Sequence, residues 1–314
     1  MSQMHQVTLR APVEISGTGV HSGESVSVTL HPAEPNHGIV FLRTGLPNGI
    51  DRLIEARHIN VSATELCTVV GARESGCVAT IEHLMASLAG LGVDNVLVEI
   101  DGTEVPILDG SAAPFVEAIE AAGTITQAAS RRVLRVRRPV RVEKGASFVE
   151  LLPAERGLKL DVEIDFADSA IGRQRRVCDL TPATFRREIA AARTFGFMRD
   201  VEALWKAGFA LGASLENTVA VGEDGVINPE GLRFADEFAR HKLLDAVGDL
   251  ALAGHPLAAH YRAHRGGHRL NFAVLEALFA DRANYEIVEV GSTRREPAEA
   301  ALPLPLAAFG GRAV

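Results

Sequence analysis

The sequence predicts an α+β protein built from two related domains. In each half of the 314-residue chain, runs of strands come before the helices instead of alternating with them one by one. Two pairs of segments also recur in the same order: SVTLHPAE (27–34) matches FVELLPAE (148–155), and EHLMASLAGLG (82–92) matches RHKLLDAVGDL (240–250). Two ordered matches indicate a duplicated unit.

The spacing of these matches predicts an insertion in the second half. The strand pair is offset by 121 residues and the helix pair by 158, so the second half carries about 37 more residues between its strands and its helix. The small and polar residues of 121–132 place a boundary there, giving domains 1–126 and 127–314. The insertion falls near 191–217, and a Pro- and Ala-rich tail without clear periodicity begins at about 292.

Hydrophobic periodicity predicts the individual elements. Strands are expected at 7–15, 25–30, 39–43, 95–100 and within 133–165. Helices are expected from about residue 80, at 111–123, at about 182–192 and 235–253, and at 272–281. SGTGVHSG (16–23) lacks the GK[ST] ending of a phosphate loop and joins two predicted strands, so we expect a hairpin turn there.

Composition excludes several classes of protein. The net charge is −8 and no long Lys/Arg run occurs, which argues against a nucleic-acid surface. The three cysteines lack CxxC spacing, so neither a disulfide framework nor a cysteine zinc site is indicated, and this usage fits a reducing compartment. No leader pattern and no run of 18 apolar residues is found. We therefore expect a soluble, cytoplasmic protein without stable membrane insertion.

The segment FARHKLLDAVGDLAL (238–252) combines an apolar stripe with a polar one. His241, Asp245 and Asp249 follow one another at intervals of four residues, so they share one face of a helix. A His and an Asp one turn apart can bind one metal ion. Taken alone, the same spacing also fits a surface pair or a hydrogen-bonded core histidine.

The matching helix of the first half strengthens the metal interpretation. Glu82 and His83 begin an otherwise apolar helix, and if the two helices face each other, His83 can join His241 and Asp245. Two imidazoles and one carboxylate leave a coordination position open, as in catalytic zinc sites, and the neighbouring Glu82 can then take a proton from the attacking water. The alternative for Glu82 is a carboxylate that favours the helix dipole.

Two further segments qualify as parts of a site. The glycines of HRGGHRLN (264–271) allow a turn that aims His268 at the cluster, where Asp249 can hold the imidazole protonated; the plain alternative is a loop. The insertion is apolar, and it must either cover core or line a pocket. Its apolar residues are Met198, Val201, Leu204, Trp205, Phe209 and Leu211.

Long motifs of the chain resemble the UDP-3-O-acyl-N-acetylglucosamine deacetylases of Gram-negative lipid A synthesis. The resemblance runs from about Val7 to about Glu289 and is carried by TIEHLMASLAGLGVDN, PILDGSAAPFVEAI, ARTFGFMRD, GLRFADEFARHKLLDAVGDL and GGHRLN. It implies two domains of like topology, each with a β-sheet layered against paired helices, and an active site between them. It also implies hydrolysis of the substrate's N-acetyl group, the committed step of that pathway.

The resemblance assigns roles to individual residues. It implies zinc held by His83, His241 and Asp245, with iron(II) compatible with the same ligands. It implies Glu82 as general base, His268 as electrostatic catalyst and general acid, Asp249 as the partner of His268, and Thr194 as a donor to the oxyanion. Lys242 and Phe166 match positions that hold the diphosphate and the uracil, Met198 and Val201 match the acyl passage, and the turn with His21 approaches the site.

Two rival functions fit parts of the same pattern. Non-haem iron(II) oxygenases also use two His and one carboxylate, but they usually carry a close HxD pair that is not seen here. A nucleotide-sugar or lipid carrier would explain an apolar pocket and leave the pairing of Glu82 with His83 unexplained. Because one chain supplies every expected ligand, a monomer is sufficient.

Overall fold

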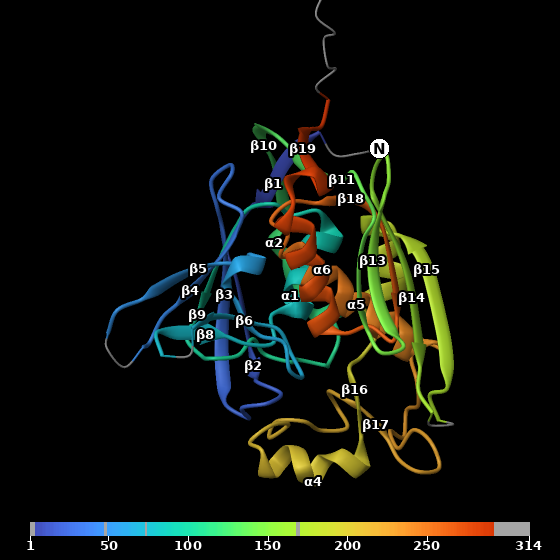
Figure 1. Ribbon diagram of the computed structural model, residues 1–314. Helices are drawn as coiled ribbons and strands as arrows, with labels where there is room; N and C mark the ends of the chain where they lie inside the picture. Colours follow the sequence, from blue (N-terminus) through green and yellow to red (C-terminus); the bar gives the residue numbers. More distant parts are fainter. Residues whose placement is uncertain (1–3, 47–48, 73, 168–169, 292–314) are drawn as a thin grey trace, which may run out of the picture.

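The computed structural model describes residues 4–46, 49–72, 74–167 and 170–291, so the predicted tail from residue 292 lies outside the described residues. Two sheets flank a central layer of helices (Figure 1). The helices of this layer are α1 (Glu82–Leu91), α2 (Ala113–Ala122), α5 (Glu237–Ala251) and α6 (His268–Ala280). Their apolar faces are buried in one continuous core, which includes Leu84 and Leu88 of α1 and Leu244 and Val247 of α5.

The two sheets share one topology. The first sheet has the strand order β2 (Val13–Thr18), β3 (Ser25–Pro32), β9 (Val96–Ile100), β4 (Ile39–Arg43), β5 (Arg52–Glu55). The second repeats it with β12 (Val140–Lys144), β13 (Ser147–Pro153), β18 (Leu257–His264), β14 (Leu158–Asp165), β15 (Arg173–Asp179). In both, the central strand runs antiparallel to the second and parallel to the fourth. The predicted duplication of an α+β unit is confirmed.

Further strands lie at one end of the molecule (Figure 1). β11 (Arg132–Val136) and β19 (Tyr285–Glu289) extend the second sheet beyond β18, and β1 (His5–Leu9) pairs with β10 (Thr124–Ser130). The predicted domain boundary after residue 126 falls inside β10, and the division at that point stays a prediction. The single strand expected at 7–15 is wrong: the chain bends at 10–12, where Pro12 has no N–H to donate to a strand ladder.

Two helix predictions in the second half are corrected. The stretch 182–192 forms a single turn, α3 (Pro182–Thr184), and a π-helix, η2 (Phe185–Ile189), whose buried Phe185 ring fills the space beside Gly90. α6 begins at His268 and not at 272, directly after the extended Gly267. The histidine that the sequence placed in a glycine turn therefore occupies a helix N-terminus.

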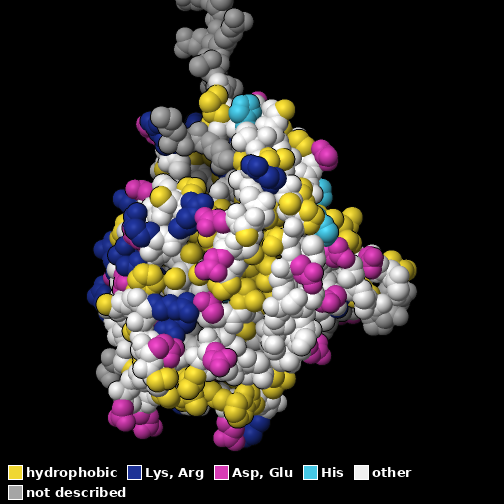
Figure 2. Space-filling model, turned by 180° about the vertical axis from the view of Figure 1, so that it is seen from behind, with side chains coloured by type: hydrophobic (Ala, Val, Ile, Leu, Met, Phe, Trp, Pro, Cys, Tyr) yellow, Lys and Arg dark blue, Asp and Glu magenta, His cyan; other side chains and the backbone are white. Residues whose placement is uncertain are grey.

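The remaining elements are short. Between β5 and α1 lie η1 (His58–Asn60) and a small sheet of β6 (Val61–Ala63), β7 (Val69–Ala72) and β8 (Gly76–Val78). The predicted insertion contains β16 (Phe195–Phe197) and α4 (Met198–Lys206), and β17 (Val219–Val221) follows it. η3 (Arg282–Asn284) precedes β19. α4 lies at the lower end in Figure 1, and Figure 2 shows apolar side chains gathered at that end. Within the described ranges, no helix has the length and apolar character required to cross a bilayer.

A glycine allows the two central helices to approach closely. Gly248 of α5 packs against the backbone of Glu82 at the start of α1, and a Cβ at this position would overlap the Glu82 carbonyl. This explains why the sequence places a glycine seven positions after His241. The contact brings the two helices, and the polar residues that they carry, close together.

Gly248→Ala is expected to lower the free energy of unfolding by about 1–3 kcal/mol, because the added methyl group overpacks a backbone contact. The midpoint of urea denaturation measures the change. Gly196→Ala is the matched control, since nothing lies within 4 Å of a Cβ there. An equal loss in both variants would contradict the packing argument.

Candidate metal centre

Three predicted ligands meet between α1 and α5. His83 is the second residue of α1, and His241 and Asp245 lie one turn apart on α5. One ligand atom from each lies within 4.8 Å of the other two, and all three side chains are buried. The Asp245 Oδ1 atom is 3.3 Å from His241 Nε2 and 3.7 Å from His83 Nε2. This arrangement brings the three side chains together as the sequence predicted.

The hydrogen bonds around the cluster fit a metal ion. Asp245 Oδ1 is buried and has no hydrogen-bond partner among the described residues, although two imidazole nitrogens surround it. His241 Nδ1 lies 3.0 Å from the Ala192 carbonyl oxygen and donates to it. That bond leaves the lone pair of Nε2 directed into the cluster, as in many histidine metal ligands. A cation at the centre would satisfy the orphaned carboxylate oxygen.

Electrostatics give His241 and Asp245 the protonation states that a metal requires. Burial lowers the pKa of His241 to about 3, so its imidazole is neutral. Burial by itself raises the pKa of Asp245, but His241 and the Lys242 ammonium outweigh it and hold this pKa well below its usual range. Lys242 Nζ donates to Asp245 Oδ2 at 2.7 Å. Two imidazoles and one carboxylate suit zinc or iron(II).

Two acid–base groups lie beside the cluster. Glu82 is 3% exposed, and burial raises its pKa, an effect that the nearby His268 and His83 reduce. His268 Nε2 is 3.8 Å from Glu82 Oε1 and 3.9 Å from Asp245 Oδ2. Burial lowers the pKa of His268, but the carboxylates of Asp249 and Glu82 reverse this effect and raise it to about 10. The site thus holds a buried carboxylate next to a cationic imidazole.

A hydrogen-bond network orients the imidazole of His268. Its Nδ1 donates to Asp249 Oδ2 at 2.9 Å, as the sequence predicted. Asp249 also accepts bonds from Thr68 Oγ1 at 2.6 Å and Asn271 Nδ2 at 2.8 Å, and the Tyr261 hydroxyl donates to Asn271 Oδ1 at 2.6 Å. The Thr68 backbone N–H also donates to Glu82 Oε2 at 3.0 Å. The donors therefore hold Asp249 on the side of His268 that faces away from the cluster.

Sequence reasoning missed three members of this network. Asn271 lies three residues after His268, on the same helix face, and this spacing is a signal that could have identified it. Thr68 lies in the loop between β6 and β7, and Tyr261 lies on β18. Neither of these two belongs to a pattern that marks it in the sequence, because only the packing of α5 against distant segments brings them to Asp249.

Phe166 and Thr194, two other predicted site residues, lie on segments next to the cluster. The Phe166 ring, just after β14, packs against Phe195 and Phe197 of β16 with centroid separations of 5.9 and 5.7 Å. Thr194 lies just before β16, and its backbone N–H donates a hydrogen bond to the Gly110 carbonyl at 2.8 Å. These contacts place β16 and its flanking residues next to α5, since Phe195 also meets His241 edge-on at 6.2 Å.

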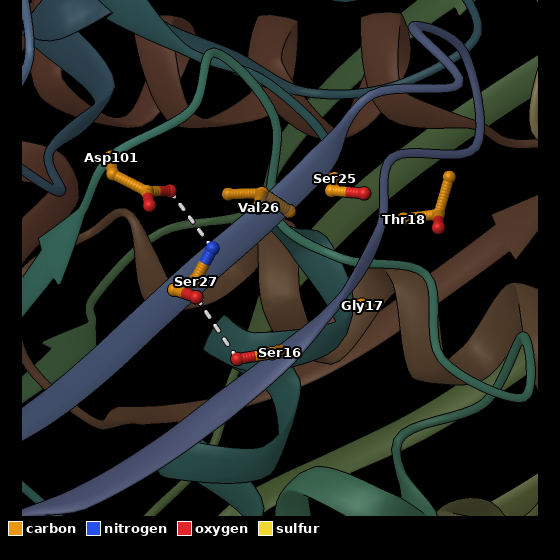
Figure 3. Close-up of a pocket in the computed structure, with 7 residues that line it drawn as sticks. All are labelled: Ser16, Gly17, Thr18, Ser25, Val26, Ser27 and Asp101. Atoms are coloured by element: carbon orange, nitrogen blue, oxygen red, sulfur yellow. Dashed lines mark hydrogen bonds between the residues drawn. The ribbon is translucent and has the colours of Figure 1, made fainter.

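The remaining predicted residues lie on the insertion and on the first-half hairpin. Met198 and Val201 lie on α4, and the Met198 side chain is 47% exposed. His21 meets Phe209 edge-on at 5.5 Å. Burial lowers the pKa of His21, Glu104 opposes this, and the charge of His268 adds to the lowering, so the two imidazoles are within electrostatic reach of each other. The shallow pocket in Figure 3 lies elsewhere, along β2, β3 and Asp101.

Comparison with known proteins identifies the family. Residues 6–280 match the family model described as UDP-3-O-acyl N-acetylglycosamine deacetylase. Proteins of Brucella ovis and Brucella canis, each named UDP-3-O-acyl-N-acetylglucosamine deacetylase, are 50% identical to this chain over 287 residues, which cover 91% of it and 99% of each relative. A protein of the same name from Brucella melitensis biotype 2 is 49% identical over the same length. The chain belongs to the UDP-3-O-acyl N-acetylglycosamine deacetylase family.

Proposed function

We propose that this protein hydrolyses the 2-N-acetyl group of UDP-3-O-((R)-3-hydroxyacyl)-N-acetylglucosamine, giving acetate and the free amine, the committed step of lipid A biosynthesis. Family membership supports the substrate class. One structural observation carries the reaction type: a buried carboxylate and a cationic imidazole lie 3.8 Å apart beside a His-His-Asp cluster. This combination suits a reaction in which water loses a proton and an amine gains one.

In this proposal His83, His241 and Asp245 hold zinc, and iron(II) is the alternative that the same ligands accept. The bound ion would supply Lewis-acid polarisation of the acetyl carbonyl and would lower the pKa of the attacking water. Glu82 takes a proton from that water, and its raised pKa favours this role. The new C–O bond gives an oxyanion, which the charged His268 and the Thr194 hydroxyl stabilise.

Breaking the C–N bond requires a proton on the departing nitrogen. His268 is the proposed donor, with Asp249 behind it to hold the ring in position, and the newly protonated Glu82 is the alternative donor. Lys242 is assigned to the diphosphate and must exchange its bond to Asp245 for that ligand, and Phe166 is assigned to the uracil. Met198 and Val201 are assigned to the acyl chain, which suits the apolar end of the molecule seen in Figure 2.

The location and the oligomeric state are part of the same proposal. We place the protein in the cytoplasm, which agrees with the free thiols of Cys67 and Cys178 and with the expectation of a reducing compartment. One chain supplies the whole cluster, so we propose a monomer.

Acetate release from the UDP-sugar substrate by the purified protein, with one metal ion per chain, tests the proposal. Oxygen consumption without acetate would favour an iron oxygenase instead. Substrate that is bound and recovered unchanged would favour a carrier.

His268→Ala is expected to lower kcat by about 10²–10⁴-fold, because the variant loses the oxyanion's cationic partner and the proton donor together. KM should change little, since these interactions form only as the reaction proceeds. His264→Ala is the matched control, because His264 pairs with Glu163 on β14. Equal losses in kcat and in substrate affinity would argue against this role of His268.

A further inference from the structure

A buried carboxylate outside the cluster connects two parts of the site. Glu104 follows β9 and is 3% exposed. Its Oε1 accepts the His21 backbone N–H at 2.9 Å and the Thr80 hydroxyl at 2.8 Å, and its Oε2 accepts the Ser22 backbone N–H at 2.8 Å. A carboxylate without such donors would be costly to bury, so these bonds compensate its desolvation.

One of these donors belongs to the entrance of α1. Thr80 has a φ of 55°, in the left-handed region that β-branched residues rarely adopt. It lies two residues before Glu82 and three before His83. The bond to Glu104 therefore helps to hold a strained backbone at the point where α1 begins.

The other two donors, the backbone N–H groups of His21 and Ser22, belong to the turn between β2 and β3. Part of the insertion packs against this turn. Leu211 N–H donates to the His21 carbonyl at 3.2 Å, and Gly212 N–H donates to the Val20 carbonyl at 3.0 Å. The Phe209 ring adds its edge-on contact with His21. The segment that follows α4 is thus attached to the first-half turn by backbone hydrogen bonds.

Two glycines show how closely these parts fit. A Cβ on Gly19 would overlap Glu104 Oε2 and Ser22 Oγ, and a Cβ on Gly212 would overlap the Gly19 carbonyl. Neither glycine has a left-handed φ, so the need is for space and not for an unusual dihedral angle. The base of the same hairpin is fixed by Ser27, which bonds to Ser16 and to Asp101 (Figure 3).

We propose that Glu104 is a positioning residue that sets the selectivity for acyl-chain length. It fixes the turn against which the insertion docks, and through Thr80 it relates that turn to the start of α1. The inference rests on the proposed function, which assigns the acyl chain to the insertion. Glu104 itself then touches neither substrate nor metal, and it acts by holding the chain-binding segment at one distance from the reacting acetyl group.

The test compares kcat/KM for two substrates, one with a long 3-hydroxyacyl chain and one with a truncated chain. Glu104→Ala should lower the long-to-short ratio on the order of tenfold, chiefly by raising KM for the long chain, because both oxygens that accept the His21 and Ser22 backbone N–H groups are lost. Thr80→Ala removes only the bond near α1 and leaves the turn its two backbone bonds, so it should lower the ratio by less than Glu104→Ala does. Glu14→Ala, which removes an exposed carboxylate on β2, is the matched control and should match the wild type.

Gly212→Ala tests the same contact from the insertion, without altering Glu104, and decides the question if Glu104→Ala does not fold. It should also lower the ratio. An unchanged ratio in either folded variant would overturn the inference. Acetate release by the wild type with equal kcat/KM for both chains would overturn the inference alone, whereas no acetate from the wild type would overturn the proposed function as well.

Discussion

Replacing Glu82 with glutamine is expected to lower kcat for acetate release by about 10²–10⁴-fold while the protein still binds its metal. Glutamine keeps the shape of the side chain but cannot take a proton from water. The metal should stay because the three ligand side chains are unchanged. Steady-state kinetics and metal content, measured on the same preparation, check both parts.

Glu117→Gln, on the exposed side of α2, is the control for a loss of charge and should keep wild-type activity. Full activity of Glu82→Gln would assign the general base elsewhere. Loss of metal together with activity would mean that Glu82 supports the cluster instead of the proton transfer.

The second large effect is expected for His241→Ala, which should lose both the bound metal and acetate release. The variant removes one of three ligands and leaves the buried Asp245 carboxylate with fewer partners, so affinity for the metal falls steeply. Metal content after dialysis, measured alongside acetate release, gives the two readouts.

His31→Ala is the matched control, because His31 pairs with Glu99 on the first sheet and lies outside the cluster. Metal retained equally by His241→Ala and by the wild type would mean that the polar stripe of α5 is structural or serves another chemistry.

The parts of the site that lie on helices were predictable from the sequence. Helical periodicity places His241, Asp245 and Asp249 on one stripe, and the duplicated pattern directs attention to His83. The close crossing at Gly248 then brings the two helices together. Local spacing and an internal repeat together pointed to the three residues of the cluster.

The parts that depend on irregular backbone were not predictable in the same way. The π-helix at 185–189 and the break at 10–12 arise from packing and from a missing N–H, which periodicity does not report. Thr68 and Glu104 act through loop contacts across the fold. The chain has 40 acidic residues, and nothing in the sequence marks Glu104 as one that is buried.

The division of the cluster between α1 and α5 determines when the site can form. During synthesis the first half emerges with His83 alone, and the other two ligands follow 158 and 162 residues later. The helices meet through apolar side chains and at Gly248, so the packing between the halves is made by the chain's own residues. The complete cluster can therefore form only after both halves are made, and a chain that ends before α5 carries one of its three residues.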